Sequence, residues 1–155
     1  MAKISAGLLL YRHKKGNLEV FLVHPGGPYW SKREDQAWSI PKGELEKGEE
    51  PLKRAQLEFH EETGSEIKGN FYELTPVKQP SGKIIHSWAV EGEFNPSSFK
   101  SNTFSMEWPP KSGMYREFPE VDRGEWFTIE EACKKIVSGQ QPLLDQLLAL
   151  VSKKP

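Results

Sequence analysis

The sequence predicts an α/β protein in which a mixed β-sheet is covered by helices on both faces. Two apolar runs near the start are separated by a short turn, and further apolar runs with partial alternation follow a central amphipathic segment. Two more amphipathic segments end the chain. Strands, a helix, strands and helices in this order favour a sheet that is packed between helical layers.

The first strands are expected to form a hairpin. Residues 4–11 and 18–23 are apolar, and residues 14–17, Lys-Lys-Gly-Asn, are typical of a turn. Residues 24–36 form a long irregular connection, and connections of this length in compact domains are often functional. A short strand over residues 38–41 is then expected to lead into the central loop.

The second half of the chain is expected to contain four strands, a turn and two helices. Thr128 is expected to cap the first of these helices, with Glu131 completing a capping box. Cys133 in that helix is expected to be buried. The strands are expected over residues 71–79, 83–94, 103–108 and 124–128, the turn over 95–100, and the helices over 129–137 and 142–150.

The composition favours a cytoplasmic protein with one domain over residues 1–155. A single cysteine excludes an internal disulfide and fits a reducing compartment. No apolar run approaches the roughly 18–20 residues of a membrane span. A net charge of −1 gives no basic surface for long nucleic acids. The expected partner is therefore a small molecule, and the chain is expected to be a monomer or a homodimer.

The chain is organised around residues 40–64, where a glycine-containing loop leads into a helix. Pro51 suits the first helical position, and Gly64 suits the left-handed residue that follows the last turn. Apolar residues recur on one face of this helix, which should therefore pack on a core. These residues are Leu52, Ala55 and Phe59.

Three glutamates, Glu58, Glu61 and Glu62, gather on another face of the same helix. Like charges at this spacing repel each other, and the last turns of a helix disfavour anions. One interpretation is a solvated acidic face. The preceding loop favours another, because carboxylates together with backbone carbonyls are the hard oxygen ligands of Mg²⁺ or Mn²⁺ bound beside phosphates.

This stretch resembles the box of the Nudix family, which reads Gly, five residues, Glu, seven residues, then Arg-Glu-apolar-any-Glu-Glu-any-Gly-apolar. Gly43 and Glu49 have the required separation, and residues 58–64, Glu-Phe-His-Glu-Glu-Thr-Gly, follow in register. Two positions depart from the pattern. Leu57 stands where the family has arginine, and Ser65 stands where the family has an apolar residue.

The resemblance implies a Nudix-type α/β/α sandwich and Mg²⁺-dependent hydrolysis, with Mn²⁺ as the alternative metal. The substrate class would be a nucleoside diphosphate linked to a further group. A pyrophosphate repels an incoming water, so metal ions must neutralise its oxygens and lower the pKa of the nucleophile. The implied metal ligands are Glu58, Glu61, Glu62 and the backbone carbonyl of Lys42 or Gly43.

The family pairs the residue that corresponds to Glu49 with the box arginine, which braces the loop against the helix. With Leu57 at that position, the nearest cation is Arg54, one turn before Glu58. Arg54 therefore either replaces the missing arginine or remains a solvated cation. Leu57 removes none of the implied metal ligands.

A general base is expected from outside the box. Glu120 matches the placement of a distal glutamate in several Nudix members, and Glu117 and Glu125 are its rivals. Lys42 lies in the sequence Pro-Lys-Gly, residues 41–43, at the start of the box. It resembles a lysine of diadenosine tetraphosphate hydrolases and could hold a polyphosphate as a point charge. The alternative is a flexible surface lysine. Tyr29, Trp30 and Trp108 are the candidates for stacking on a base, although most aromatic residues will pack in the core.

Dinucleoside polyphosphates are thus the leading substrates. One alternative is a nucleoside triphosphate pyrophosphohydrolase that cleanses the nucleotide pool. Another is RNA 5′-end processing, which the absence of a basic stripe weakens. A non-catalytic nucleotide sensor is disfavoured because the box acids are all present.

Overall fold

The structure, a computed structural model, describes residues 3–95 and 101–152. Within these residues seven strands form one mixed sheet. Their bounds are β1 Ile4–Lys14, β2 Asn17–Pro25, β3 Lys42–Glu44, β4 Tyr72–Glu73, β5 Val77–Lys78, β6 Ile84–Glu91 and β9 Val121–Thr128. The main path runs β4-β6-β1-β2-β9, while β3 pairs with β1 and β5 pairs with β6.

The strands β1 and β2 form the expected antiparallel hairpin, with Tyr11 opposite Val20 and Lys14 opposite Asn17. On the other side of β1, strand β6 runs parallel to it over its full length. The remaining pairs are antiparallel, including β2 with β9. The sheet is therefore mixed, as the order of elements predicts.

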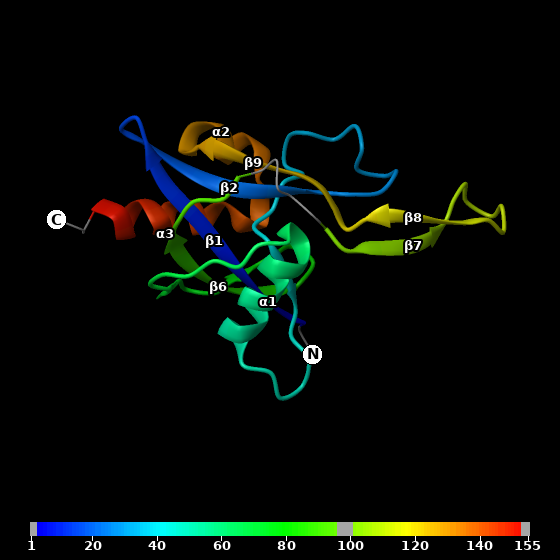
Figure 1. The fold of residues 1–155 in the computed structure, drawn as a ribbon, viewed down its shortest axis with the longest axis horizontal. Helices are drawn as coiled ribbons and strands as arrows, with labels where there is room; N and C mark the ends of the chain where they lie inside the picture. Colours follow the sequence, from blue (N-terminus) through cyan, green and yellow to red (C-terminus); the bar gives the residue numbers. More distant parts are fainter. Residues whose placement is uncertain (1–2, 96–100, 153–155) are drawn as a thin grey trace.

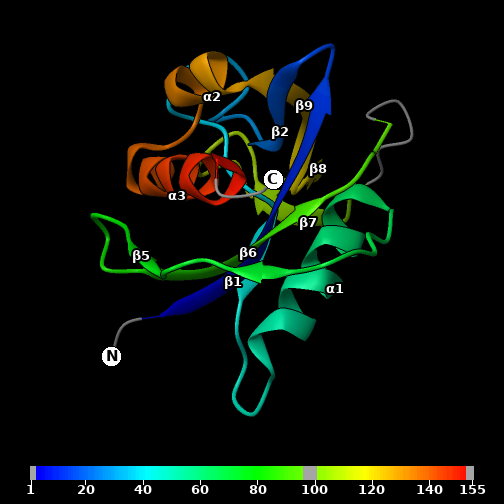
Figure 2. The same cartoon turned by 90° about the vertical axis from the view of Figure 1, so that its left-hand side faces the viewer.

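Helices cover both faces of this sheet (Figure 1 and Figure 2). The helix α1, Pro51–Thr63, packs on one face, and α2, Ile129–Lys135, and α3, Gln141–Ser152, pack on the other. Strand alternation divides the buried side chains between two cores. Leu8 and Leu10 of β1 point to the α1 side, whereas Leu9 points to the α2 and α3 side. The α/β/α sandwich is confirmed.

The start of α2 has the expected capping box. Glu131 donates its backbone N–H to the Thr128 hydroxyl and accepts the backbone N–H of Thr128 on its carboxylate. Cys133 was expected in the core, and this expectation is wrong, because its side chain is exposed. The short helix directs Ala132 to the core instead, and the next residue falls on the outer side.

Two expected strands differ from the structure. Residues 38–41 form only isolated bridges, from Ser39 to Val23 and from Trp38 to Ile136, and regular pairing starts at β3. The run over residues 71–79 is divided into β4 and β5, which pair with successive parts of β6. Pro76 lies between them and has no N–H to donate to a ladder.

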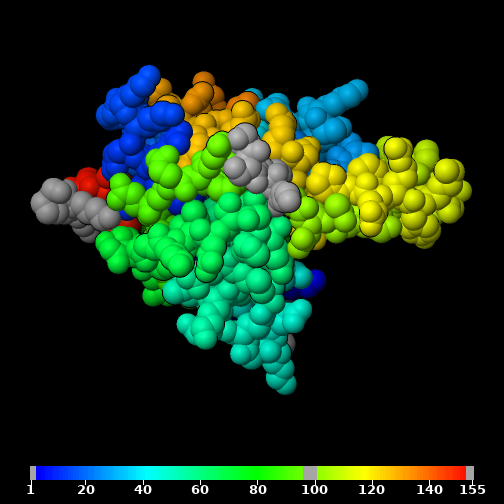
Figure 3. All heavy atoms as spheres, viewed as in Figure 1, coloured from blue at the N-terminus to red at the C-terminus, as the bar shows by residue number. Residues whose placement is uncertain are grey.

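A second, two-stranded sheet projects from the body as an arm (Figure 1 and Figure 3). It consists of β7, Thr103–Glu107, and β8, Tyr115–Pro119, which pair antiparallel. The strand β7 was expected and β8 was not. The turn expected over residues 95–100 lies outside the described residues, except for Asn95. In the described ranges, no helix is both long and apolar enough to cross a membrane.

Candidate active site

Helix α1 holds the box acids at one end of the sheet. Pro51 occupies its first turn, and Gly64 ends it in the left-handed conformation at φ 79°, donating its N–H to the carbonyl of His60. Ala55 and Phe59 are buried in the core beside β1. With that stripe fixed, the last two turns carry three acidic residues of the box. These residues are Glu58, Glu61 and Glu62.

Glu62 is the most deeply buried of these acids, with 7% of its surface exposed. Its carboxylate lies beside Lys42, yet Oε2 has no hydrogen-bond partner among the described residues. Burial raises the pKa of Glu62 well above its ordinary value, and the nearby Glu58 carboxylate raises it further. A buried carboxylate oxygen without a partner is suited to a bound cation.

The Glu58 carboxylate lies directly on the loop backbone at Gly43. A Cβ atom on Gly43 would lie 2.0 Å from Glu58 Cδ and 2.2 Å from its Oε1. Burial raises the pKa of Glu58, and the carboxylates of Glu61 and Glu120 add to this effect, while Arg54 opposes it. The first box glycine is therefore needed because no side chain fits between loop and carboxylate.

Arg54 joins the loop to the helix. Its Nε donates to both carboxylate oxygens of Glu49, at 2.9 and 3.0 Å, and its Nη2 also contacts Glu49. Its Nη1 donates to Glu58 Oε1 at 2.8 Å. Leu57, which occupies the position of the box arginine, is 43% exposed. Arg54 thus contacts Glu49 and Glu58 from a position one helical turn before that of the box arginine.

Lys42 begins β3 and lies opposite Gly7 of β1. A Cβ atom on Gly7 would lie 2.6 Å from the Pro41 carbonyl oxygen, so glycine lets the loop lie directly on the strand. The Lys42 side chain is half-buried, and this burial lowers its pKa, with Glu62 opposing the shift. Lys42 is therefore not a flexible surface lysine.

Glu120 is held beside the end of α1 by a chain of backbone hydrogen bonds. Asn102 N–H donates to the Glu61 carbonyl at 3.2 Å, and Glu120 N–H donates to the Asn102 carbonyl at 2.8 Å. Gly26 N–H then donates to the Glu120 carbonyl at 2.9 Å. Glu120 lines the cavity described next, and its rivals, Glu117 and Glu125, are not among the residues that line it.

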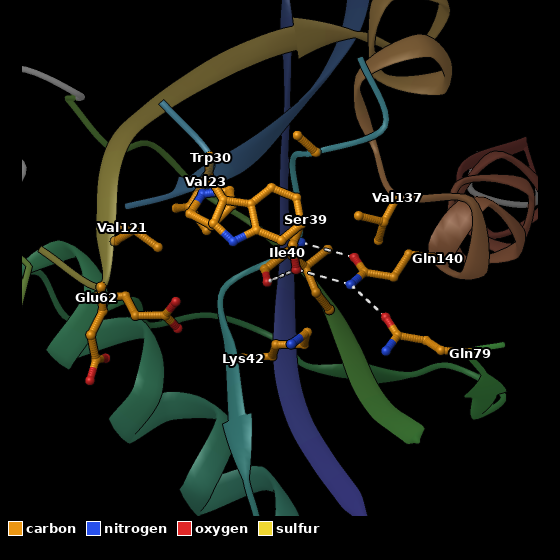
Figure 4. Close-up of a pocket in the computed structure, with 13 residues that line it drawn as sticks. Val23, Trp30, Ser39, Ile40, Lys42, Glu62, Gln79, Val121, Val137 and Gln140 are labelled. Carbon is orange, nitrogen blue, oxygen red and sulfur yellow. Dashed lines mark hydrogen bonds between the residues drawn. The ribbon is translucent and has the colours of Figure 1, made fainter. Parts of the chain in front are cut away.

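A cavity of about 330 Å³ connects these residues to the loop over residues 24–36 (Figure 4). Lys42, Glu62 and Glu120 supply its charged groups, and Trp30 supplies an aromatic surface. The complete lining is Val23, Pro25, Trp30, Ala37, Ser39, Ile40, Lys42, Glu62, Gln79, Glu120, Val121, Val137 and Gln140. A space of this size falls within the range of small-molecule sites.

The other aromatic candidates lie outside this cavity. Tyr29 is 60% exposed and contacts Trp108 edge to face, with ring centroids 5.3 Å apart. Gln79 and Gln140 are among the lining residues that the sequence analysis missed. Both lie in irregular or short helical segments with no recognisable pattern, so no sequence signal identifies them.

The acids are near one another but do not form a ready-made cluster. Across residues 3–95 and 101–152, no three histidine, cysteine or acidic side chains are placed to hold a metal ion. Glu58 is instead paired with Arg54, while Glu62 keeps an unpartnered oxygen. The donor set of carboxylates and loop carbonyls still has the hard oxygen chemistry of a Mg²⁺ site.

An acidic helix and a half-buried lysine at a cavity, on an α/β/α sandwich, are the features of a Nudix-type protein. The particular family follows from comparison: the NUDIX domain model matches residues 1–147, and the chain belongs to this family. It is therefore a hydrolase of pyrophosphate bonds, from a family that generally uses divalent metals and acts on small nucleotide substrates.

Individual relatives are distant. The RNA pyrophosphohydrolase of Brucella anthropi is 27% identical over 123 residues, 74% of this chain and 69% of the relative. The Caenorhabditis elegans Ap4A hydrolase, solved as a binary complex, superposes with a TM-score of 0.71 at 21% identity, covering 99% of this chain and 100% of that one. The NUDIX domain of Shewanella oneidensis NrtR, solved with ADP ribose, gives 0.68 at 12% identity, covering 97% and 89%. These structural likenesses concern the fold.

Proposed function

We propose that this protein is a Mg²⁺-dependent hydrolase of dinucleoside polyphosphates that cleaves a phosphoanhydride bond. The observation that carries this proposal is the convergence of Lys42, Glu62 and Glu120 on one cavity that also contains Trp30. A lysine ammonium beside metal-binding carboxylates suits a polyphosphate substrate, because the ammonium and the metal ions together neutralise its negative charge. The Pro-Lys-Gly sequence of residues 41–43 supports polyphosphates as the substrate class, and the fold shared with an Ap4A hydrolase suggests the first substrate to try.

The metal would be held by the box acids and the loop backbone. Glu62 fits this role because its Oε2 is buried without a partner. Glu58, Glu61 and the carbonyl of Lys42 or Gly43 complete a set of oxygen ligands. The bound cation would neutralise phosphate oxygens and lower the pKa of the attacking water.

The other residues act through position and charge. Lys42 holds phosphate oxygens as a partly desolvated point charge. Glu120 accepts a proton from the attacking water as general base, and Trp30 stacks on a base inside the cavity. Tyr29, on the outside, stacks on the second nucleoside. Arg54 is a positioning residue that braces Glu49 and fixes the Glu58 carboxylate.

A substrate panel tests the proposal. Diadenosine tetraphosphate, nucleoside triphosphates and a 5′-triphosphorylated RNA oligonucleotide are incubated with Mg²⁺ or Mn²⁺, and products are identified by chromatography. We expect the dinucleoside polyphosphate to have the highest kcat/KM, and Glu62→Gln and Glu120→Gln to lower kcat by about 100-fold or more. Preferred turnover of nucleoside triphosphates would replace the proposal with the pool-cleansing function. Nucleotide binding with no turnover of any compound would support a sensor.

The RNA pyrophosphohydrolase relative favours a second candidate, removal of pyrophosphate from RNA 5′ ends. An RNA 5′-triphosphate presents the same phosphoanhydride to the same groups. The net charge of −1 argues against it, because RNA binding usually relies on a basic surface. In the panel this candidate requires faster turnover of the oligonucleotide than of the free triphosphate.

A further inference from the structure

Three neutral polar residues, Ser39, Gln79 and Gln140, line the cavity among apolar side chains (Figure 4). They are distinct from the charged set formed by Lys42, Glu62 and Glu120. Gln140, in the short 3-10 helix η2 (Ser138–Gln140), is completely buried. Because a buried amide must satisfy its donors and acceptors, the orientation of each amide can be derived from its partners.

The backbone fixes the orientation of Gln140. Its Oε1 accepts the N–H of Ile40 at 3.0 Å, and a backbone N–H can only donate. The Gln140 Nε2 must then face the other way, where it donates to Ser39 Oγ at 2.9 Å. The Ser39 hydroxyl donates its own proton to the Ile40 carbonyl at 2.7 Å, so it is free to accept.

Gln140 in turn fixes the orientation of Gln79. Its Nε2 also donates to Gln79 Oε1 at 3.4 Å, so Gln79 presents its oxygen to Gln140 and turns its own Nε2 away (Figure 4). The backbone of Gln79 is held by its N–H bond to the Lys83 carbonyl, at 2.8 Å. Gly139 packs against it, since a Cβ there would lie 3.0 Å from Gln79 Cγ. Within the described part of the chain, Gln79 Nε2 has no acceptor.

We propose that Gln79 is a specificity-determining residue that presents a fixed amide donor to a purine in this cavity. The chemical class it favours is a 6-oxopurine over a 6-aminopurine. A carbonyl at position 6 accepts the Gln79 N–H, whereas an amino group would place two donors against each other. This inference rests on the proposed function, because it takes the cavity to hold the base of a nucleotide substrate, and within that function it places dinucleoside polyphosphates with a 6-oxopurine ahead of diadenosine tetraphosphate.

Inosine diphosphate and adenosine diphosphate are the most direct probes, because their bases differ only at the 6-position edge. Binding of each to the full chain with Mg²⁺ is measured by titration calorimetry. The expected result is an affinity for inosine diphosphate higher by about 10-fold, the consequence of one mispaired donor. Equal affinities, or no binding of either probe, would overturn the proposal.

Substitutions test whether the Gln79 amide donor causes the preference for inosine diphosphate. Gln79→Glu keeps the contact with Gln140 but replaces the donor by an acceptor, so the preference should reverse toward adenosine diphosphate. Gln140→Glu replaces the donor that orients Gln79 by an acceptor, so the Gln79 amide should turn its Nε2 toward position 140 and the preference should again reverse toward adenosine diphosphate. Gln36→Glu adds the same charge at an exposed position and should leave the ratio unchanged. A preference that survives both cavity substitutions would contradict the inference.

Folding and function are controlled separately. Thermal unfolding shows whether each variant is folded, and Gln79→Leu provides a second uncharged test if Gln79→Glu is not. That variant should bind both probes with similar affinity. The hydrolysis panel tests the proposed function independently. Turnover of dinucleoside polyphosphates without base preference would retain the proposed function and reject the role of Gln79.

Discussion

The conformation of one carboxylate explains why the box begins with glycine. Gly43 does not adopt a left-handed conformation, so backbone freedom is not its main contribution. Glycine is needed at this position because it has no Cβ, and the Glu58 side chain occupies the space that a Cβ would take. A methyl group there must displace either the carboxylate or the loop, and both supply the proposed metal ligands.

Gly43→Ala should therefore impair hydrolysis more than stability. We expect kcat to fall by about 100-fold, the scale associated with displacing a catalytic group by roughly 1 Å. Steady-state kinetics with saturating Mg²⁺ measures this, and thermal unfolding checks that the variant is folded. Gly48→Asn is the matched control, because Gly48 lies in the same loop at φ 85° with open space around it. Full activity of Gly43→Ala would show that the contact has no catalytic role.

Arg54 should perform the task that the box assigns to the position of Leu57. Arg54→Gln removes the bidentate contact with Glu49 and the contact with Glu58, so we expect kcat to fall by about 10-fold or more with little change in KM. Kinetics measures this change. Lys53→Gln, an exposed neighbour on the same helix, is the control.

A second substitution can restore the missing cation. Leu57 is 43% exposed, so an arginine fits there without entering the core. In the Arg54→Gln background, Leu57→Arg should recover a large part of kcat, because it returns a guanidinium to the side of the helix that the family uses. If the double variant is no better than Arg54→Gln alone, the bracing account of Arg54 is wrong.

At the scale of elements, the long strands and the helices of the sandwich could be predicted because each has a buried face. Strand alternation in β1 and the apolar stripe of α1 both follow from packing on the core. The strand β8 lies in the projecting arm, with Tyr115, Arg116 and Glu117 all exposed. Without a buried face it has no hydrophobic period, so no pattern of apolar residues indicated a strand there.

The site could be predicted only in part for a similar reason. Glu58, Glu61 and Glu62 are grouped by the helix itself, so local spacing is sufficient to bring them together. The pairing of Arg54 with Glu49 depends on the path of the loop. The position of Gln79 beside Gln140 depends on how distant segments pack, which spacing along one sequence does not specify.

The turn that presents Glu120 depends on a second close approach by glycine. A Cβ atom on Gly26 would lie 1.9 Å from the Pro119 carbonyl oxygen, while the Gly26 N–H donates to the Glu120 carbonyl. The end of β2 thus contacts the turn between β8 and β9 directly. Any side chain at this position must displace that turn, and Glu120 with it.

We expect Gly26→Ala to lower kcat by about 100-fold through displacement of Glu120. The substitution is assayed with Mg²⁺ alongside Glu120→Gln. Because both variants would lose the same group, combining them should cause little further loss. Gly113→Asn, at the open tip of the arm, is the control. If the fold-losses in kcat of the two single variants multiply in the double variant, the two substitutions act independently and this coupling is wrong.

For the molecule as a whole, the site should reduce stability in the absence of metal. Glu62 is buried beside Glu58, and its Oε2 has no described partner. Burial raises the pKa of Glu62 in the folded chain above its value in the unfolded chain. Between these two pKa values the folded chain binds more protons. The free energy of unfolding must therefore fall as the pH rises through that range.

Glu62→Gln removes this titration, so the variant should be more stable than the wild type at neutral pH while losing hydrolysis. The advantage should shrink as the pH falls toward the ordinary range of a carboxyl group, where Glu62 is protonated in both states. Urea unfolding in EDTA, from neutral pH down to the ordinary range of a carboxyl group, measures the difference in the free energy of unfolding between the two proteins. Glu66→Gln, at an exposed position after α1, is the control. Added Mg²⁺ should stabilise the wild type more than Glu62→Gln, because a ligand that binds only the folded state raises its stability. If the variant is less stable at every pH, burial of the Glu62 carboxylate does not oppose folding.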